Sequence, residues 1–298
     1  MARKTKQSIF YKYHKLNIHL YELLLHNRFY LASHKEANDP YDCRCKLTRE
    51  YVELLYDNER LNSMEMHGFL QEWRASDLYN EDMSIYNWAL EQDAENENAT
   101  LARKSGKPKL WTIPETLDYI FDNEYSETKF NNEFMECNDF NVVSFSVVDE
   151  NRDLPMWAYY AGAFDGVRIK LDFNEDATNF RLQSIRNVKY STWTQVKNDA
   201  DLKRAYFTKA KNWRNEQEWR IGLYTDKFLT FDKLIVKEIT FGHRVSIPQM
   251  MGIIKMCIEL GYNAKYFIRE FTANGLRPRE VDIKEWRYIE YINPLKRH

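Results

Sequence analysis

The stretch "NWRNEQEWRIGLY", residues 212–224, alternates apolar and polar residues along its second half. In an extended chain Trp219 and Ile221 lie on one face, which is typical of a strand that covers a core. Glu216 and Glu218 share the other face only in such a strand, because a helix turns them about 200° apart. The pattern predicts a strand over "EWRIGLY" (218–224), and a backbone that is extended from Glu216 onward would carry both carboxylates on its polar face. Solvated strand faces also carry Glu and Arg, so a purely structural role stays open.

Other segments show the same two periodicities of strand and helix. Alternation or β-favouring composition predicts strands in "IFYKYHKL" (9–16), "FNVVSFSVV" (140–148), "GVRIKLDF" (166–173), "RNVKYS" (186–191), "VKEITFG" (236–242) and "REVDIKEWRYIEY" (279–291). Helical spacing predicts helices in "LNIHLYELLLHN" (16–27), "DLPMWAYYAGAF" (153–164) and "PQMMGIIKMCIELGY" (248–262). Strands separated irregularly by helices indicate an α+β fold.

The region 46–138 differs in character from the rest of the chain. It is densely charged, poor in valine and isoleucine, and helical in its periodicity. Pro114 fits the first turn of a helix that begins near Ile113. The sequence therefore predicts a core domain of 1–45 and 139–298, with 46–138 as a helical insertion that could serve as a lid or a partner surface.

Charge and composition exclude several classes of protein. The 298 residues carry 43 basic and 45 acidic side chains, a net charge of −2, which argues against a nucleic-acid coat protein. No apolar run is long enough to span a membrane, and the basic start lacks the apolar segment of a signal peptide. The four cysteines have no zinc-site spacing. We expect a cytoplasmic protein with reduced thiols, no membrane partner and no metal.

Three segments carry further candidate residues. Ser144 and Ser146 share one face of a predicted strand, where serines usually form only local hydrogen bonds. In the helix at 153–164, Trp157 and Tyr160 lie on the face expected to be core, whereas Tyr159 lies off it and is free to stack on a ring. In "YKYH" (11–14), Tyr11 and Tyr13 share one face of the predicted strand. Lys12 and His14 lie on the opposite face.

The turn "ANDPYD", residues 37–42, offers Asn38, Asp39 and Asp42. Such a turn is usually a local Asx-type structure. Its carboxylates could instead bind Mg²⁺ together with Glu216 and Glu218, as in nucleases.

An ordered series of motifs gives a family resemblance. The series is "YKYH" (11–14), "ANDPYD" (37–42), "SFS" (144–146), "MWAYYAGAFDGVRIKLDF" (156–173), "VKY" (188–190) and "NWRNEQEWR" (212–220). It resembles the bacterial family called domain of unknown function 2971 over nearly the whole chain, apart from the insertion. That family often has His before the Tyr of its helix, where this chain has Tyr159.

The order of these motifs is also similar to that of ADP-ribosyltransferases. The resemblance implies a central, mostly antiparallel sheet and NAD as substrate, with Glu218 stabilising the ribosyl cation and Glu216 orienting or deprotonating the acceptor. It further implies that an NAD pocket is formed by Lys12, Tyr13, His14, Ser144, Ser146, Tyr159, Tyr160 and Arg220. The superfamily's usual arginine is absent from the first motif, where Lys12 would replace it.

Three functions follow as hypotheses. The first is an NAD-consuming ADP-ribosyltransferase-like enzyme that modifies a protein or nucleic acid, for which the resemblance suggests the context of a toxin or phage-defence effector. The second is a Mg²⁺-dependent nuclease that uses Asp39, Asp42, Glu216 and Glu218. The third is a non-enzymatic interaction or sensor module, with the aromatic clusters as core and 46–138 as its partner surface.

Overall fold

The computed structural model describes residues 7–33, 36, 39, 42–43, 45–57, 83–84, 87, 112–136, 140–191, 194–224, 226–273 and 275–285. The chain forms two compact units. The first, the sheet unit, comprises 1–43, 139–192 and 206–298, and the second comprises 44–138 and 193–205. The second unit thus contains 193–205 in addition to the region that the sequence predicts as an insertion.

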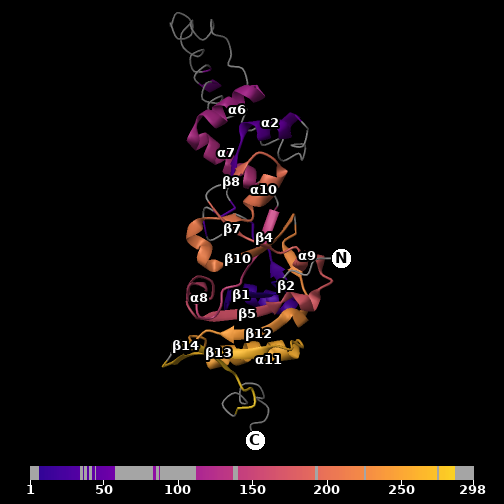
Figure 1. Ribbon diagram of the computed structural model, residues 1–298, viewed down its shortest axis with the longest axis vertical. Coiled ribbons are helices and arrows are strands. Elements are labelled where there is room, and N and C mark those ends of the chain that lie inside the picture. Colours follow the sequence, from indigo (N-terminus) through magenta and orange to yellow (C-terminus); the bar gives the residue numbers. More distant parts are fainter. Residues whose placement is uncertain are drawn as a thin grey trace, which may run out of the picture. The chain divides into compact units, whose positions relative to one another are not determined.

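The sheet unit is built on an eight-stranded sheet (Figure 1). All neighbouring strands run antiparallel except β12 and β13, which are parallel. In sheet order the strands are β14 (Gly275–Glu280), β13 (Lys265–Thr272), β12 (Val236–Phe241), β5 (Gly166–Asp172), β1 (Ile9–Lys15), β4 (Phe140–Ser146), β10 (Glu218–Tyr224) and β6 (Arg186–Asn187). The fold is therefore mixed α and β with a large, mostly antiparallel sheet.

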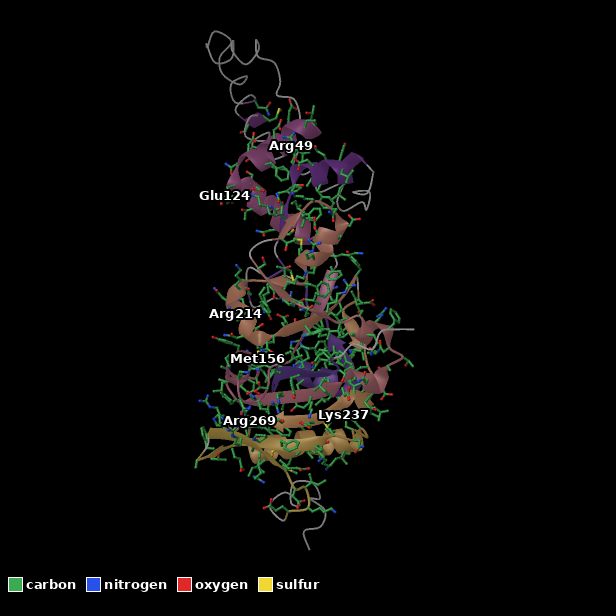
Figure 2. The ribbon with its side chains drawn as sticks, in the orientation of Figure 1. Arg49, Glu124, Met156, Arg214, Lys237 and Arg269 are labelled. Atoms are coloured by element: carbon green, nitrogen blue, oxygen red, sulfur yellow. The ribbon has the colours of Figure 1, made fainter. Side chains whose placement is uncertain are left out.

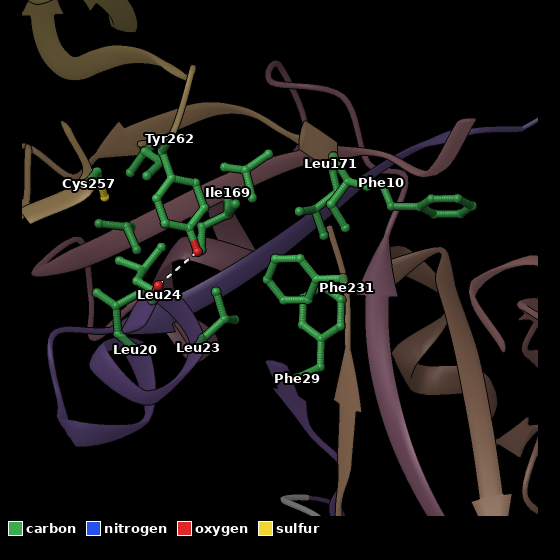
Figure 3. Close-up of a cluster of buried hydrophobic side chains, with 14 of the residues drawn as sticks. Phe10, Leu20, Leu23, Leu24, Phe29, Ile169, Leu171, Phe231, Cys257 and Tyr262 are labelled. Carbon is green, nitrogen blue, oxygen red and sulfur yellow. Dashed lines mark hydrogen bonds between the residues drawn. The ribbon is translucent and has the colours of Figure 1, made fainter. Parts of the chain in front are cut away.

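One face of the sheet carries the main apolar core, together with helices α1 (Ile18–His26) and α11 (Ile247–Glu259). Phe29 and Phe231 stack in this core with ring centroids 4.3 Å apart (Figure 3). The hydroxyl of Tyr262 donates to the carbonyl oxygen of Leu24 at 2.9 Å, which satisfies its polar end within the apolar cluster (Figure 3). Apolar burial on this face follows directly from the alternation in the strands.

The opposite face is polar, yet it is also buried. Directly opposed residues of antiparallel strands point to the same side. The register pairs Glu218 with Ser146, Arg220 with Ser144, and Tyr13 with Arg168. Helix α8 (Leu154–Tyr160) packs here, with Trp157 against Tyr13. Arg168 and Arg220 are each 1% exposed, so the polar side of the alternation is not a solvated face.

Shorter elements complete the sheet unit. They are β2 (Arg28–Tyr30), η2 (Phe173–Asp176), α9 (Phe180–Gln183), β7 (Lys189–Tyr190), β9 (Thr208–Lys209), η3 (Lys211–Glu216), β11 (Phe228–Thr230) and η4 (Lys233–Ile235). The strand predicted at 279–291 is confirmed only at 279–280, which end the edge strand β14, and is wrong at 281–285, which form no strand. The remainder of that prediction lies outside the described residues.

The second unit combines helices with a short parallel strand pair. Strand β3 (Cys45–Leu47) pairs with β8 (Thr194–Val196), which explains why 193–205 belongs to this unit. Its helices are α2 (Arg49–Asp57), α6 (Ile113–Asp122), α7 (Glu124–Glu136) and α10 (Asp199–Ala205). Helix α6 begins with a capping box between Thr112 and Glu115 and has a proline in its first turn, as the sequence predicts.

Candidate functional site

Glu216 and Glu218 belong to different elements. Strand β10 starts at Glu218, whereas Glu216 is the last residue of the 3-10 helix η3. Gln217 between them has a left-handed backbone with φ of 45°. The strand predicted over "EWRIGLY" (218–224) is confirmed, whereas the extended backbone considered from Glu216 onward is not found. The two carboxylates converge through a turn and not through the two-residue repeat of a strand.

The ammonium of Lys209 joins the two carboxylates. Its Nζ lies 2.7 Å from Glu216 Oε2 and 3.1 Å from Glu218 Oε2, and 3.7 Å from Asp42 Oδ2. Strand β9 holds Lys209 in place by parallel pairing with β7, where Tyr190 is its register partner. Tyr190 itself accepts a 2.7 Å hydrogen bond from the backbone N–H of Glu218.

Arg220 binds the other side of Glu218. Its Nε donates to Glu218 Oε1 at 2.6 Å, and one Nη donates to Asp42 Oδ2 at 2.7 Å. The other Nη donates to the carbonyl oxygen of Tyr206 at 2.9 Å and to Cys43 Sγ at 3.2 Å. All three guanidinium nitrogens are thus bound within the protein, so Arg220 has no unbound nitrogen for the NAD pocket in which the resemblance places it.

The serines and Tyr160 complete the surroundings of the glutamates. Ser146 Oγ donates to the carbonyl oxygen of Glu216 at 2.7 Å and accepts from the backbone of Val148. Ser144 hydrogen-bonds Glu218. Tyr160, at the end of α8, donates its hydroxyl proton to Glu216 Oε1 at 2.5 Å. The structure therefore brings both serines of the "SFS" motif to the glutamate pair.

We call these five charged residues the carboxylate–lysine cluster: Asp42, Lys209, Glu216, Glu218 and Arg220. Each is at most 8% exposed. Three carboxylates and two cations leave a net charge of −1 when all are ionised. Buried charges of this kind persist because each one is paired and hydrogen-bonded.

The two glutamates have pKa values shifted in opposite directions. Burial, aided by the charge of Glu218, raises the pKa of Glu216 despite its bonds to Lys209 and Tyr160. Burial also acts to raise the pKa of Glu218, but the charges of Arg220 and Lys209 outweigh it and lower that pKa to about 2. Glu218 is therefore a permanent anion at neutral pH, and Glu216 is the carboxylate closer to exchanging a proton.

Aromatic rings border the cluster. Tyr159 is 62% exposed, and its ring centroid lies 6.5 Å from that of Tyr160 and 6.0 Å from that of Trp213. Lys209 Nζ lies 5.0 Å from the centroid of the Trp213 ring. On the same 3-10 helix Arg214 is exposed to solvent (Figure 2). The exposed ring of Tyr159 and the half-buried rings of Tyr160 and Trp213 thus lie at the edge of the buried carboxylates.

Tyr13 and Trp157 belong to a different cluster, centred on Asp153. The fully buried Asp153 accepts hydrogen bonds from Tyr13 Oη at 3.1 Å and Trp157 Nε1 at 2.9 Å. Arg168 and Arg269 also donate to its carboxylate, at 3.1 Å and 2.8 Å; Arg269 lies on β13 (Figure 2). The Tyr13 hydroxyl and the Trp157 ring are therefore engaged away from the glutamates.

Lys12 and His14 point to the apolar face of the sheet, opposite to the serines. Lys12 Nζ donates to the carbonyl oxygen of Ser144 at 3.0 Å, and burial lowers its pKa to about 8. Burial lowers the pKa of His14 to about 3. The side chains of Lys12 and Tyr13 thus bind Ser144 and Asp153 and not the glutamates, although the charge of Glu218 acts to raise the pKa of Lys12.

In the second motif, Asp39 is 5% exposed and Asp42 joins the cluster, while Asn38 lies outside the described residues.

A metal-binding interpretation meets a specific obstacle at this cluster. The position between Asp42, Glu216 and Glu218 is taken by the ammonium of Lys209. Within the part of the chain that the structure describes, no group of three or more His, Cys, Asp or Glu side chains is arranged to hold a metal ion. Among the same residues, no helix is long and apolar enough to cross a membrane.

Lys209 and Trp213 were not among the residues predicted from the sequence. Trp213 lies inside the motif "NWRNEQEWR" (212–220), which is a usable signal, whereas Lys209 lies three residues before that motif. Lys209 and Lys211 both precede the motif closely, and the structure buries the first beside the glutamates and exposes the second.

Comparison with known proteins gives no match: no family model, no curated protein and no solved structure matches the chain. The resemblances to domain of unknown function 2971 and to ADP-ribosyltransferases therefore stay predictions. The geometry of the cluster has to carry the functional argument by itself.

Proposed function

We propose that the carboxylate–lysine cluster transfers a ribosyl group from a pyridinium nucleotide of the NAD type, in the manner of an ADP-ribosyltransferase. One observation carries the proposal: Glu216 and Glu218 share the ammonium of Lys209, yet their pKa values are shifted in opposite directions. At sites of glycosyl transfer, two carboxylates with pKa values separated by their surroundings divide the work: one exchanges a proton and the other stabilises positive charge.

The chemistry assigns each glutamate a role. Loss of nicotinamide leaves positive charge on the ribose, as in glycoside cleavage. Glu218, held as an anion by Arg220 and Lys209, would stabilise that charge. Glu216, with its raised pKa, would exchange the proton of the attacking group. The net negative charge of the cluster favours both the cationic pyridinium and the developing ribosyl cation.

The surroundings suit an NAD-type substrate. Tyr159 and Trp213 offer rings on which a flat heterocycle can stack. The solvent-exposed Lys211 and Arg214 are available to a pyrophosphate, in place of the buried Arg220. The acceptor in this proposal is a protein or nucleic acid, and the biological role is that of a toxin or phage-defence effector with an ADP-ribosyltransferase-like fold.

The test follows nicotinamide release from NAD by the purified chain. Glu218→Gln keeps the shape but removes the charge, and we expect the rate to fall at least about 100-fold. Glu238→Gln, which changes a strand glutamate paired with Lys170, is the matched control and should keep the rate. Stabilisation of the wild-type chain by NAD in a thermal scan gives a second measure that does not depend on the variant folding. Unchanged NAD, with no shift in melting temperature, would contradict the proposal.

A second candidate is a non-enzymatic interaction or sensor module. It is favoured by the fact that both carboxylate oxygens of Glu218 are bound by protein cations and that this side chain is only 5% exposed. Such a network can simply fix one arrangement of the sheet and its loops. In that case NAD stays intact and deletion of 46–138 abolishes capture of a binding partner.

A further inference from the structure

Tyr160 and Glu216 form one of the shortest hydrogen bonds of the site. The phenol oxygen lies 2.5 Å from Glu216 Oε1, and the second oxygen of Glu216 lies 2.7 Å from Lys209 Nζ. A hydroxyl bound to a carboxylate that a third group orients is the arrangement of an activated nucleophile: attacking group, base and orienting group in sequence.

Exposure distinguishes Tyr160 from the glutamates. Glu216 and Glu218 are 6% and 5% exposed, whereas Tyr160 is only half-buried. Both oxygens of Glu218 are also taken by Arg220 and Lys209. Among these three groups, the phenol of Tyr160 is therefore the one that a bound ribose can approach most closely. Glu218 acts on the ribose through its charge alone.

The protonation states fit this division. Burial, together with the charges of Glu216 and Glu218, raises the pKa of Tyr160 although Lys209 opposes the shift. The phenol is thus neutral at physiological pH and needs a base to become a nucleophile. Glu216, which already accepts its hydrogen bond, is in position to take the proton.

We propose that Tyr160 attacks the ribose with Glu216 as its general base, so that transfer proceeds through a covalent ribosyl–tyrosine intermediate; this inference rests on the proposed function. In the first step the Tyr160 oxygen bonds to the anomeric carbon and its proton passes to Glu216. The bond from that carbon to the pyridinium nitrogen breaks, and its electron pair leaves with neutral nicotinamide. In the second step the oxygen of water or another acceptor bonds to the same carbon. The phenolate leaves, recovers its proton from Glu216, and the acceptor's proton goes to solvent.

Two displacements at one carbon return the starting configuration, whereas one displacement inverts it. The test therefore uses NAD, whose anomeric carbon is β, with methanol as acceptor. Proton NMR then reads the configuration of the methyl riboside formed by the wild-type chain. We expect the β product. The α product would overturn the intermediate while leaving the proposed function standing.

The residue is identified on the same protein. Rapid quenching followed by peptide mass spectrometry should find an ADP-ribosyl group on Tyr160, and Tyr160→Phe should lower nicotinamide release at least about 100-fold. Tyr21→Phe, on the exposed side of α1, is the matched control and should keep the rate. A β product with full activity in Tyr160→Phe would also overturn the assignment. NAD left intact by the wild-type chain would overturn this inference and the proposed function together.

Discussion

Arg220 and Asp42 are 178 residues apart in the chain, and their side chains meet at 2.7 Å in the interior of the sheet unit. Arg220 is 1% exposed and Asp42 is 8% exposed. This pair fixes Asp42, the last residue of the "ANDPYD" motif, to strand β10. It therefore ties that residue to the strand that carries Glu218.

We expect Asp42→Asn to destabilise the protein by about 3–5 kcal/mol, because the buried cations Arg220 and Lys209 each lose a negatively charged partner. Urea unfolding followed by circular dichroism measures the change. Glu238→Gln is the control, since it opens the partly exposed pair with Lys170, and should cost under about 1 kcal/mol. Equal effects of the two substitutions would show that the interior pair is not selectively important.

The lowered pKa of Glu218 predicts a loss of stability in acid. A carboxyl whose pKa falls from 4.5 in the unfolded chain to about 2 in the folded one stabilises the fold above pH 4.5. That contribution disappears as the pH falls from 4.5 to about 2, with a slope of up to about 1.4 kcal/mol per pH unit. Glu218→Gln should flatten the slope in this window. Urea unfolding across the window measures it, and an unchanged slope in the variant would contradict the assignment.

Much of the sheet could be predicted because its signal is local. The alternation in "GVRIKLDF" places Ile169 and Leu171 in the core, where both are fully buried. The same alternation puts Arg168 on the other face but does not say whether that face meets water. Its partner Asp153 is 15 residues away and Arg269 is 116 residues from Asp153, so the pattern within one strand contains no trace of them.

The site was predictable in part for the same reason. The two glutamates and two serines stand out as short motifs, and the structure brings these four side chains together. Tyr13 belongs to the same ordered series of motifs but binds Asp153 instead, because strand parity fixes the face of the sheet and not the position along it. The left-handed Gln217 was not predictable, since any residue between two glutamates can continue a strand.

Asp153 connects the position of α8 to the chemistry of Glu216. It stands directly before α8, yet its side chain forms no capping hydrogen bond to the helix. It binds Trp157 one turn into the helix and also Arg168 and Arg269. Tyr160 at the other end of the same short helix reaches Glu216. Asp153 is thus a positioning residue for the Tyr160–Glu216 bond.

We therefore expect Asp153→Asn to have two effects. It leaves two buried arginines with less negative charge, which should cost about 3–5 kcal/mol in urea unfolding. It should also loosen α8 and so break the hydrogen bond from Tyr160 to Glu216. Because that hydrogen bond lowers the pKa of Glu216, its loss should raise the pKa further. Carbon-13 NMR of labelled glutamate reads this pKa directly. Asp149→Asn, which changes an exposed carboxylate paired with Arg152, should leave both the unfolding midpoint and the Glu216 signal unchanged. A destabilised Asp153→Asn protein with an unshifted Glu216 would reduce Asp153 to a structural role.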